Sequence, residues 1–311
     1  MRLNRGVHVY SIPMRTRFRG ITARTGLLFE GPAGWGEFCP FEEYGDEEAQ
    51  AWLACAVEAA NVGWPEPVRD RVPVNCTVPV VGPERAHEIV SGSGCSTAKV
   101  KVAESTLEED CARLEAVRDA LGPNGFVRVD ANMMWDVDTA VTAIRAMDRA
   151  AGGLQYVEQP CHTLDELAAV RRKVTVPIAA DESIRKAEDP VKVAVAGAAD
   201  IAVIKVAPLG GVRRALEVAE ACGLPCVVSS ALETSVGMAA GVALAAALPE
   251  LDYACGLATL QLLDGDVTSD SLLPQDGYLP VLTKAPVPDR IAEFETGDQA
   301  WVERFQRVLS R

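Results

Sequence analysis

The feature that most constrains the fold is a regular alternation of two kinds of segment that begins near Pro73. Short apolar runs of strand length are separated by amphipathic stretches in which the apolar residues have helical spacing. Strands that alternate with helices in this way form parallel sheets. The expected strands are residues 74–78, 98–102, 127–130, 154–158, 177–181, 201–205, 226–229 and 253–256. The expected helices include residues 108–121, 138–150, 164–172, 213–222 and 236–248.

Eight nearly continuous apolar strands favour a closed barrel, because every strand of such a barrel is buried on both faces. The alternative is an open, doubly wound sheet. Its nucleotide-binding forms lose support because no Gly-x-Gly-x-x-Gly motif follows the first strand and the chain has no P-loop motif. We therefore predict an α/β fold with a (β/α) barrel over residues 73–262.

The segments that flank the barrel are expected to form a second, smaller unit. Residues 1–72 have the pattern of an α+β unit, with strands at 7–12, 22–30 and 35–38 and a helix at 46–61. Asp46 is the expected N-cap of that helix. The tail, residues 263–311, lacks the barrel period and is expected to pack back on residues 1–72.

Charge and composition narrow the class of partner. The net charge of −14 argues against nucleic acid or an anionic membrane as the main partner, because both favour a positively charged surface. The start of the chain has no signal-peptide pattern, and the longest apolar stretch, residues 236–248, is too short to span a bilayer. We predict a cytoplasmic protein that binds a small molecule; the sequence does not indicate its oligomeric state.

Charged residues end five consecutive apolar runs, where a buried strand should avoid them. These residues are Lys99, Lys101, Asp130, Glu158, Asp181 and Lys205. From Lys101 onward they are separated by 23 to 29 residues, one strand and one helix each time. Because the carboxyl ends of parallel strands meet at one rim of a barrel, these side chains should lie side by side there.

Buried charges must be paired or bound to a metal, and three carboxylates at one place repel one another. A hard divalent cation relieves that repulsion, and carboxylate oxygens suit Mg²⁺. Histidine is scarce, since the chain contains only His8, His87 and His162. Acid and base roles therefore fall to lysine, whose pKa drops on burial or near another cation.

These motifs resemble those of the enolase superfamily, in its muconate-lactonizing branch. The motifs that carry the resemblance are Lys99-Val-Lys101, Val129-Asp130-Ala131-Asn132, Val157-Glu158-Gln159-Pro160, Ala180-Asp181-Glu182-Ser183 and Ile204-Lys205. The resemblance implies a (β/α)7β modified TIM barrel with an α+β capping domain formed by both ends of the chain. It also implies Mg²⁺ as the cofactor and lysine as the base.

The resemblance further implies a role for each rim residue. Asp130, Glu158 and Asp181 would bind Mg²⁺. Lys101 would remove the proton α to the substrate carboxylate, and Lys205 would lie on the opposite face of the substrate. Lys99 would lower the pKa of Lys101 and approach the carboxylate. Further substrate or supporting contacts would come from Asn132, Glu182, Ser229 and Ser230, although the two serines could equally be helix caps.

Within this branch the chain is most similar to the dehydratases of menaquinone biosynthesis. The supporting segments are residues 36–40, 204–211 and 229–237. The implied reaction is a syn dehydration of a hydroxycyclohexadiene carboxylate that carries a succinyl side chain. A loop at residues 15–20 would close over that side chain, and Arg17 or Arg19 would meet its carboxylate, unless both are surface arginines.

Three alternatives stay open on the sequence alone. An N-acylamino acid racemase or dipeptide epimerase would use the same metal and the same two lysines, Lys101 and Lys205. A Schiff-base aldolase would use one lysine, but it leaves the three carboxylates unexplained. A binding protein without turnover would be expected to have lost a ligand or a lysine, and none is missing from the motifs.

Overall fold

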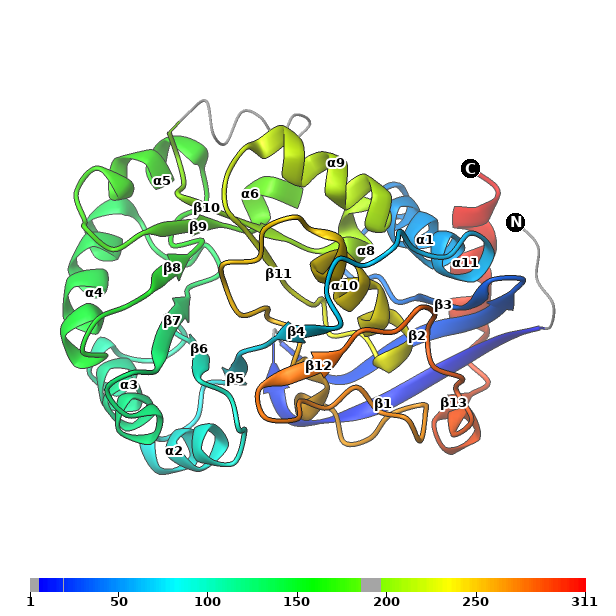
Figure 1. Ribbon diagram of the computed structural model, residues 1–311, viewed down its shortest axis with the longest axis horizontal. Helices are drawn as coiled ribbons and strands as arrows, with labels where there is room; N and C mark the ends of the chain where they lie inside the picture. Colours follow the sequence, from blue (N-terminus) through cyan, green and yellow to red (C-terminus); the bar gives the residue numbers. More distant parts are fainter. Residues whose placement is uncertain (1–5, 19, 186–196) are drawn as a thin grey trace.

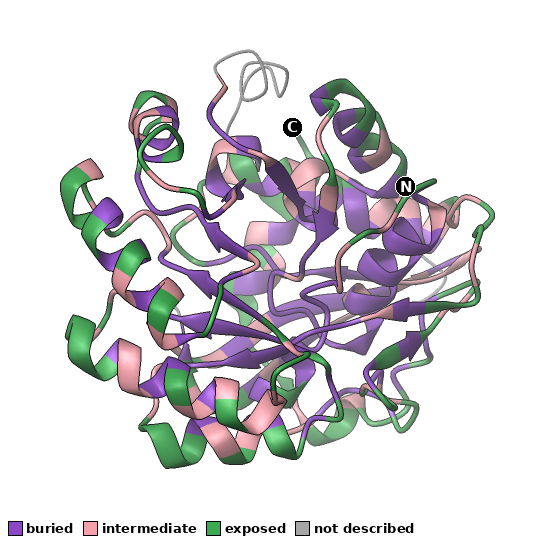
Figure 2. Ribbon diagram, turned by 60° about the vertical axis from the view of Figure 1, so that its left-hand side comes forward, coloured by how far each residue is buried: buried purple, intermediate pink, exposed green. Residues whose placement is uncertain are grey.

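The structure is a computed structural model, and it describes residues 6–18, 20–185 and 197–311. Figure 1 shows two parts: a curled parallel sheet with helices on its outside, and an antiparallel sheet covered by the helices α1 and α11. Residues of the strands and the helix faces turned toward them are buried, whereas the outer faces of the helices are exposed (Figure 2). Among the described residues no helix is both long and apolar enough to cross a membrane.

The parallel sheet has seven strands in the order β11-β10-β9-β8-β7-β6-β5. Its strands are β5 (Cys76–Val78), β6 (Thr97–Lys101), β7 (Phe126–Asp130), β8 (Tyr156–Glu158), β9 (Ile178–Ala180), β10 (Ile201–Ile204) and β11 (Cys226–Val228). Sequential strands are neighbours throughout, and nearly all of their residues are buried. This burial on both faces explains the continuous apolar runs of the sequence.

The predicted eighth strand, residues 253–256, is wrong as a regular strand. Cys255 forms a single parallel bridge with Val74, and Gly256 forms another with Ser229. Val74 lies just before β5 and Ser229 just after β11, so this segment connects the two edges of the curled sheet. The predicted strand at 74–78 is confirmed as β5 over Cys76–Val78 only, while Val74 forms an isolated bridge. The preceding residues form the short strand β4 (Arg71–Pro73), which pairs with β12 (Tyr278–Pro280).

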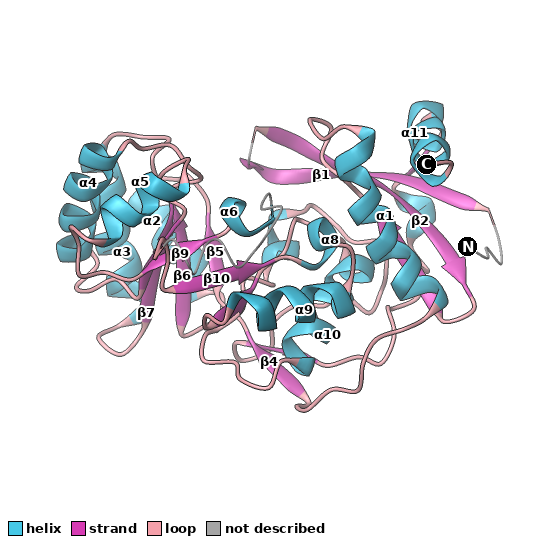
Figure 3. Ribbon diagram, turned by 90° about the horizontal axis from the view of Figure 1, so that it is seen from above, coloured by secondary structure: helices cyan, strands magenta, loops and turns pink. Residues whose placement is uncertain are grey.

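The helices after β5, β6, β7 and β8 lie on the outer side of the parallel sheet (Figures 1 and 3). Helices follow all seven strands of this sheet. They are α2 (Pro83–Ser91), α3 (Leu107–Leu121), α4 (Val137–Ala150), α5 (Leu164–Arg171), α6 (Glu182–Arg185), α8 (Val206–Leu209), α9 (Val212–Cys222) and α10 (Ser235–Ala247). The five predicted helices are confirmed to within about one residue. The side chains of Thr106, Asp136, Thr163 and Thr234 cap α3, α4, α5 and α10.

The antiparallel sheet has the order β13-β1-β2-β3 and combines strands from the N-terminal and C-terminal regions of the chain. Its strands are β1 (Val7–Phe18), β2 (Ile21–Gly31), β3 (Gly34–Phe38) and β13 (Glu295–Thr296). The helix α1 (Asp46–Asn61) begins after Gly45, so Asp46 is its first residue and not its N-cap as predicted. Gly36 lies so close to α1 that an added Cβ would be 2.2 Å from the carbonyl oxygen of Ala56.

The C-terminal tail contacts this antiparallel unit through aromatic side chains. The unpredicted helix α11 (Gln299–Leu309) places Phe305 against Phe29 and Phe38, with ring centroids 5.6 and 5.7 Å apart. Trp301 contacts the edge of Phe38 as well. The 3₁₀ turn η1 (Thr259–Leu262) lies just before the tail, and the 3₁₀ turn η2 (Ile291–Glu293) lies within it.

A fully buried arginine cross-links the inside of the curled sheet. Arg128 of β7 donates to Gln155 Oε1 at 2.6 Å, to Tyr156 OH at 3.2 Å, to Asn75 Oδ1 at 3.2 Å and to the Ala254 carbonyl at 2.6 Å. These acceptors come from β8, from the chain before β5 and from the bridging segment. One side chain therefore joins both edges of the sheet to its middle.

We expect Arg128→Ala to lower the free energy of unfolding by about 3 kcal/mol or more, because it leaves several buried acceptors without a donor. Urea unfolding followed by circular dichroism measures this loss. Arg149→Ala, at an exposed position of α4, is the matched control and should change stability by less than about 0.5 kcal/mol. Equal stabilities of the two variants would contradict the cross-linking role.

Candidate active site

The register of the parallel sheet brings the rim charges together. Lys101 of β6 pairs with Asp130 of β7, and Asp130 pairs with Glu158 of β8. Residues in register on parallel strands point to the same side, so these three side chains share the inside of the curled sheet. Asp181 and Lys205 directly follow β9 and β10 at the same rim. With Lys99, the six residues are between 0 and 8% exposed.

Each of the three carboxylates is paired with a lysine ammonium group. Lys101 Nζ donates to Asp130 Oδ2 at 2.5 Å, and Lys205 Nζ donates to Asp181 Oδ2 at 2.5 Å. Lys99 Nζ donates to both carboxylate oxygens of Glu158, at 2.9 and 2.8 Å. Lys99 also lies 3.6 Å from Asp130 Oδ2, so it connects the Lys101–Asp130 pair to the Lys99–Glu158 pair.

Burial and neighbouring charges shift the acidity of these groups. Burial raises the pKa of Glu158 to about 7, and the nearby charge of Asp130 adds to the rise. Burial acts in the same direction on Asp130, but the ammonium groups of Lys101 and Lys99 outweigh it and hold the pKa of Asp130 below its usual range. The charges of Glu158 and Asp130 outweigh the effect of burial on Lys99 and raise its pKa. Lys99 is therefore held as a cation by its carboxylate partners.

The donor set suits a hard divalent cation. Three carboxylates from neighbouring strands meet at one rim. Burial raises the pKa of Glu158, and the charges of Asp130 and Asp181 add to the rise; a bound cation would offset this by favouring the charged carboxylate. As the side chains stand, however, no three His, Cys, Asp or Glu residues of the described chain converge as a ligand set. Lysine ammonium groups pair with the carboxylates instead. The predicted Mg²⁺ ligands Asp130, Glu158 and Asp181 therefore stay a prediction.

The structure places two predicted supporting residues beside Lys101. Asn132 Oδ1 accepts from Lys101 Nζ at 2.6 Å, and Asn132 Nδ2 donates to Glu182 Oε1 at 3.3 Å. The backbone N–H of Asn132 donates to Asp130 Oδ1 at 3.1 Å, in a left-handed conformation with φ of 44°. Asn132 thus contacts both members of the Lys101–Asp130 pair.

Gln159 is a supporting residue that the sequence reasoning missed. Its Oε1 accepts from the backbone N–H of Asp181 at 2.9 Å and of Ser183 at 3.2 Å, and its Nε2 donates to Ser183 Oγ at 2.8 Å. It is fully buried and has a positive φ of 40°. Gln159 therefore holds the chain where Asp181 leaves β9. The sequence signal that could have identified Gln159 is its position directly after Glu158, in the motif Val157-Glu158-Gln159-Pro160.

A small cavity of about 30 Å³ lies over the rim charges. Its lining includes Lys99, Lys101, Asp130, Asn132, Lys205, Ser229, Ser230, Thr77 and Thr259 from the parallel unit, with Phe18 and Phe41 from the N-terminal unit. The Phe18 ring centroid is 5.1 Å from Lys101 Nζ. This volume is too small for an organic substrate, so lining side chains must move for one to bind.

The two predicted serines face this cavity and are not caps of α10, whose N-cap is Thr234. Ser230 Oγ lies 2.6 Å from Thr259 Oγ1 and accepts from the Leu232 N–H at 2.8 Å. Ser229 is buried beside Gly256 at the bridge that joins the sheet edges. Phe18, Phe41, Thr77 and Thr259 were not predicted, because no local pattern marks them as cavity residues.

The predicted arginine contacts are only partly described. Arg19 lies outside the described residues. Arg15 and Arg17 belong to β1, so the expected loop at 15–20 is wrong over residues 15–18. Arg17 is exposed, and Arg15 donates to the Leu263 carbonyl at 2.9 Å. Phe18 is the residue of this hairpin that lines the cavity.

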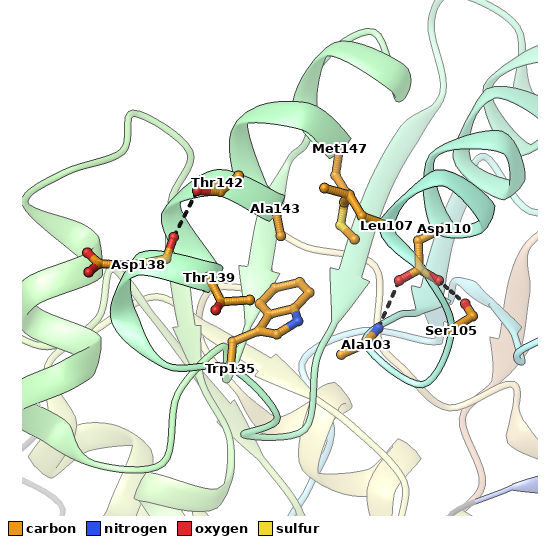
Figure 4. Close-up of a pocket in the computed structure, with 10 residues that line it drawn as sticks. All are labelled: Ala103, Ser105, Leu107, Asp110, Trp135, Asp138, Thr139, Thr142, Ala143 and Met147. Atoms are coloured by element: carbon orange, nitrogen blue, oxygen red, sulfur yellow. Dashed lines mark hydrogen bonds between the residues drawn. The ribbon is translucent and has the colours of Figure 1, made fainter.

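A larger hollow of about 510 Å³ lies elsewhere, on the outside between α3 and α4 (Figure 4). None of the rim charges lines it. Its wall contains Asp110, which accepts from the Ala103 N–H at 2.9 Å and from Ser105 Oγ at 2.6 Å. Arg113 pairs with Asp110 at 2.7 Å and donates to the Lys101 carbonyl at 3.0 Å. This side of the fold supports the Lys101 backbone, but the charged chemistry is on the inside.

The comparisons with known proteins agree with this arrangement. Residues 83–286 match the family model described as enolase C-terminal domain-like, and residues 9–60 match the one described as enolase N-terminal domain-like. The chain is 65% identical over 298 residues to the o-succinylbenzoate synthase of Thermobifida fusca (strain YX), covering 95% of this chain and 93% of that protein. It is 54% identical to that of Mycolicibacterium smegmatis, covering 96% and 93%.

Solved structures with a similar fold include two enzymes of known activity. The L-Ala-D/L-Glu epimerase from Bacillus subtilis has a TM-score of 0.78 and 25% identity, covering 92% of this chain and 98% of that one. The muconate lactonizing enzyme from Pseudomonas putida also has a TM-score of 0.78, with 22% identity and coverage of 94% and 99%. At this identity the second comparison supports the fold alone.

Proposed function

From the premise that this chain belongs to the enolase superfamily, we propose that it catalyses the o-succinylbenzoate synthase reaction of menaquinone biosynthesis. In that reaction 2-succinyl-6-hydroxy-2,4-cyclohexadiene-1-carboxylate loses water and becomes o-succinylbenzoate. The observation that carries the proposal is the 65% identity, over 95% of the chain, to a relative with that name. The prediction of superfamily membership from the rim motifs is confirmed.

The site contains what a dehydration through proton abstraction requires. Lys101, in its neutral form, would accept the proton α to the ring carboxylate and then deliver it to the departing hydroxyl, which leaves as water. Lys205, two strands beyond Glu158 along the rim, would contribute a positive charge from the opposite side of the ring. The C–H bond at the α-carbon and the C–O bond to the hydroxyl break. The ring gains a double bond and becomes aromatic, and the proton and the hydroxyl leave as one molecule of water.

Asp130, Glu158 and Asp181 would hold Mg²⁺, since they are the buried oxygen donors of the rim. When bound, Mg²⁺ would stabilise the negative charge that develops on the substrate carboxylate as the α-proton leaves. Lys99 would keep the rim cationic near that carboxylate. Asn132 and Glu182 would orient Lys101, and Ser229 and Ser230 would meet the substrate from the end of β11.

The finer architecture is part of the same proposal. The curled sheet with its bridging segment corresponds to a (β/α)7β modified TIM barrel over residues 73–262. Residues 1–72 and 263–311 correspond to the capping domain. The bridges of residues 255 and 256 and the contacts of Phe305 with β2 and β3 support this division. The cytoplasmic location and the role of Arg19 stay predictions.

We expect the purified protein, supplied with Mg²⁺, to convert the cyclohexadiene precursor with a kcat/KM of about 10⁴ M⁻¹ s⁻¹ or more, as is usual for a native substrate. Absorbance measures the aromatic product, and optical rotation measures racemisation of N-succinylamino acids in parallel. Racemisation without dehydration would favour the racemase alternative and overturn the proposed reaction. Borohydride in the presence of a carbonyl substrate should leave no adduct, which excludes the aldolase alternative.

A further inference from the structure

One wall of the cavity is a loop without regular structure. Residues 230–234 connect β11 to α10, and Ser230, Ala231 and Leu232 line the cavity beside Lys101 and Lys205. We call residues 230–234 the cavity loop. Since it belongs to no helix or strand, its backbone groups must find other hydrogen-bond partners, and these include side chains within the loop and from other elements.

Leu232 has an unusual backbone conformation within the cavity loop. Its φ of 66° is in the left-handed region, which a leucine side chain disfavours. The Leu232 N–H donates to Ser230 Oγ at 2.8 Å, and its carbonyl accepts from Arg24 Nε at 2.9 Å. A strained residue at a functional site persists only where its surroundings hold it, so these two bonds are the candidates for that role.

Arg24 comes from β2 of the antiparallel sheet and is 2% exposed. Besides the Leu232 carbonyl, it donates to the carbonyls of Ala231, at 3.2 Å, and of Cys39. Its guanidinium carbon lies 4.4 Å from the ring centroid of Phe41, which also lines the cavity. One buried guanidinium group therefore fixes two cavity walls relative to each other without itself lining the cavity.

Glu37, from β3, holds the other end of the cavity loop. Its Oε1 accepts from Tyr10 OH at 2.5 Å and from the Thr234 N–H at 3.1 Å. Its Oε2 accepts from Thr234 Oγ1 at 2.5 Å and from the Gly237 N–H at 2.8 Å. A carboxylate at the first turn of α10 is favoured by the N-terminal partial charge of the helix. Glu37 thereby anchors the residue at which the loop becomes a helix.

We propose that Arg24 and Glu37 are positioning residues that set the shape of the substrate cavity from the antiparallel sheet. They act through the cavity loop and Phe41 and do not touch the substrate. This inference rests on the proposed function, because it takes the cavity loop to shape the space for the substrate of that reaction and not the metal site. Loosening the loop should weaken substrate binding and leave the Mg²⁺ requirement unchanged.

Arg69 offers a matched control at the opposite end of the same helix. It donates to the carbonyls of Ala245, Leu248 and Pro249, at 2.5, 2.7 and 3.2 Å. Like Arg24, it is an arginine that binds several backbone carbonyls. Unlike Arg24, it holds the end of α10 away from the cavity loop. Arg69→Gln should lower the melting temperature without changing KM.

The experiment compares Arg24→Gln, Glu37→Gln and Arg69→Gln with the unmodified protein. For each, KM and kcat of dehydration, the Mg²⁺ activation constant, the Kd of o-succinylbenzoate and the melting temperature are measured. We expect Arg24→Gln and Glu37→Gln to lower kcat/KM by about 10- to 100-fold, chiefly through KM, because a shifted wall misplaces the substrate. The Kd should rise with KM, and the Mg²⁺ activation constant should stay within about twofold.

Arg24→Lys covers the case in which Arg24→Gln does not fold. Lysine keeps the charge but has no planar guanidinium to present to three carbonyls and the Phe41 ring at once, so the KM of this variant should also rise. If the unmodified protein is active but the Arg24 and Glu37 variants change only the melting temperature, as expected of Arg69→Gln, the positioning role alone is overturned. An unmodified protein that neither converts the precursor nor binds o-succinylbenzoate overturns the proposed function, and this inference with it.

Discussion

Lys101→Ala is expected to lower kcat for dehydration by about 10³-fold or more, because it removes the group that accepts and returns the proton. The structure supports this expectation through position: Lys101 is buried at the rim, faces the cavity and lies 2.5 Å from Asp130 and 2.6 Å from Asn132. Stopped or continuous absorbance assays at saturating precursor measure the change in kcat.

The removal of Lys101 also deprives Asp130 of an ion pair, so folding must be checked by circular dichroism. Lys99 remains 3.6 Å from Asp130 and limits that loss. Lys173→Ala, at an exposed lysine of the outer surface, is the control and should keep full activity. If folded Lys101→Ala retained more than about a tenth of the activity, the base would have to be another group.

Glu158→Gln should abolish detectable turnover, with a loss of about 10³-fold or more, and should weaken Mg²⁺ binding. Replacement of even an outer partner of a metal ligand typically costs 10- to 100-fold, so loss of a direct ligand should exceed that range. Glu158 is the fully buried central carboxylate of the three, between Asp130 and β9 in the sheet. Glutamine keeps its shape but removes its negative charge.

Two measurements separate the metal role of Glu158 from a structural one. Calorimetric titration gives the Mg²⁺ affinity directly, and a chelator followed by excess Mg²⁺ should reversibly remove the activity of the unmodified protein. Glu220→Gln, at an exposed position of α9, is the isosteric control and should change neither quantity. Unaltered Mg²⁺ affinity in Glu158→Gln would contradict its assignment as a ligand.

The charged residues of the rim could be predicted because the sequence pattern that marks them lies within short segments. A charge at the end of an apolar run is visible in the sequence, and the length of one strand-and-helix unit determines which charges become neighbours. Asp130 and Glu158 are in register on adjacent strands as that reasoning requires. What it did not predict is the pairing of each carboxylate with a lysine, since the side-chain conformation depends on all neighbours together.

Several local predictions failed for identifiable reasons. The segment at 253–256 has strand-like residues, but it forms only two bridges, because Cys255 and Gly256 each meet a different edge of the sheet. Asp46 suits an N-cap by type, yet it is the first residue of the helix, and Gly45 occupies the N-cap position. The helix α11 was missed, although its Trp301 and Phe305 contact the antiparallel sheet.

The sequence by itself determined the parallel α/β unit, the order of its strands and the residues at its charged rim, because strand period, helix period and buried charge are properties of short segments. Only the tertiary structure decided what stands over that rim. Phe18 and Phe41 reach the cavity from the N-terminal unit, and Arg24 and Glu37 bind the cavity loop across 208 and 197 residues of the chain. Such contacts depend on how two separately patterned units pack, and no local period encodes that packing.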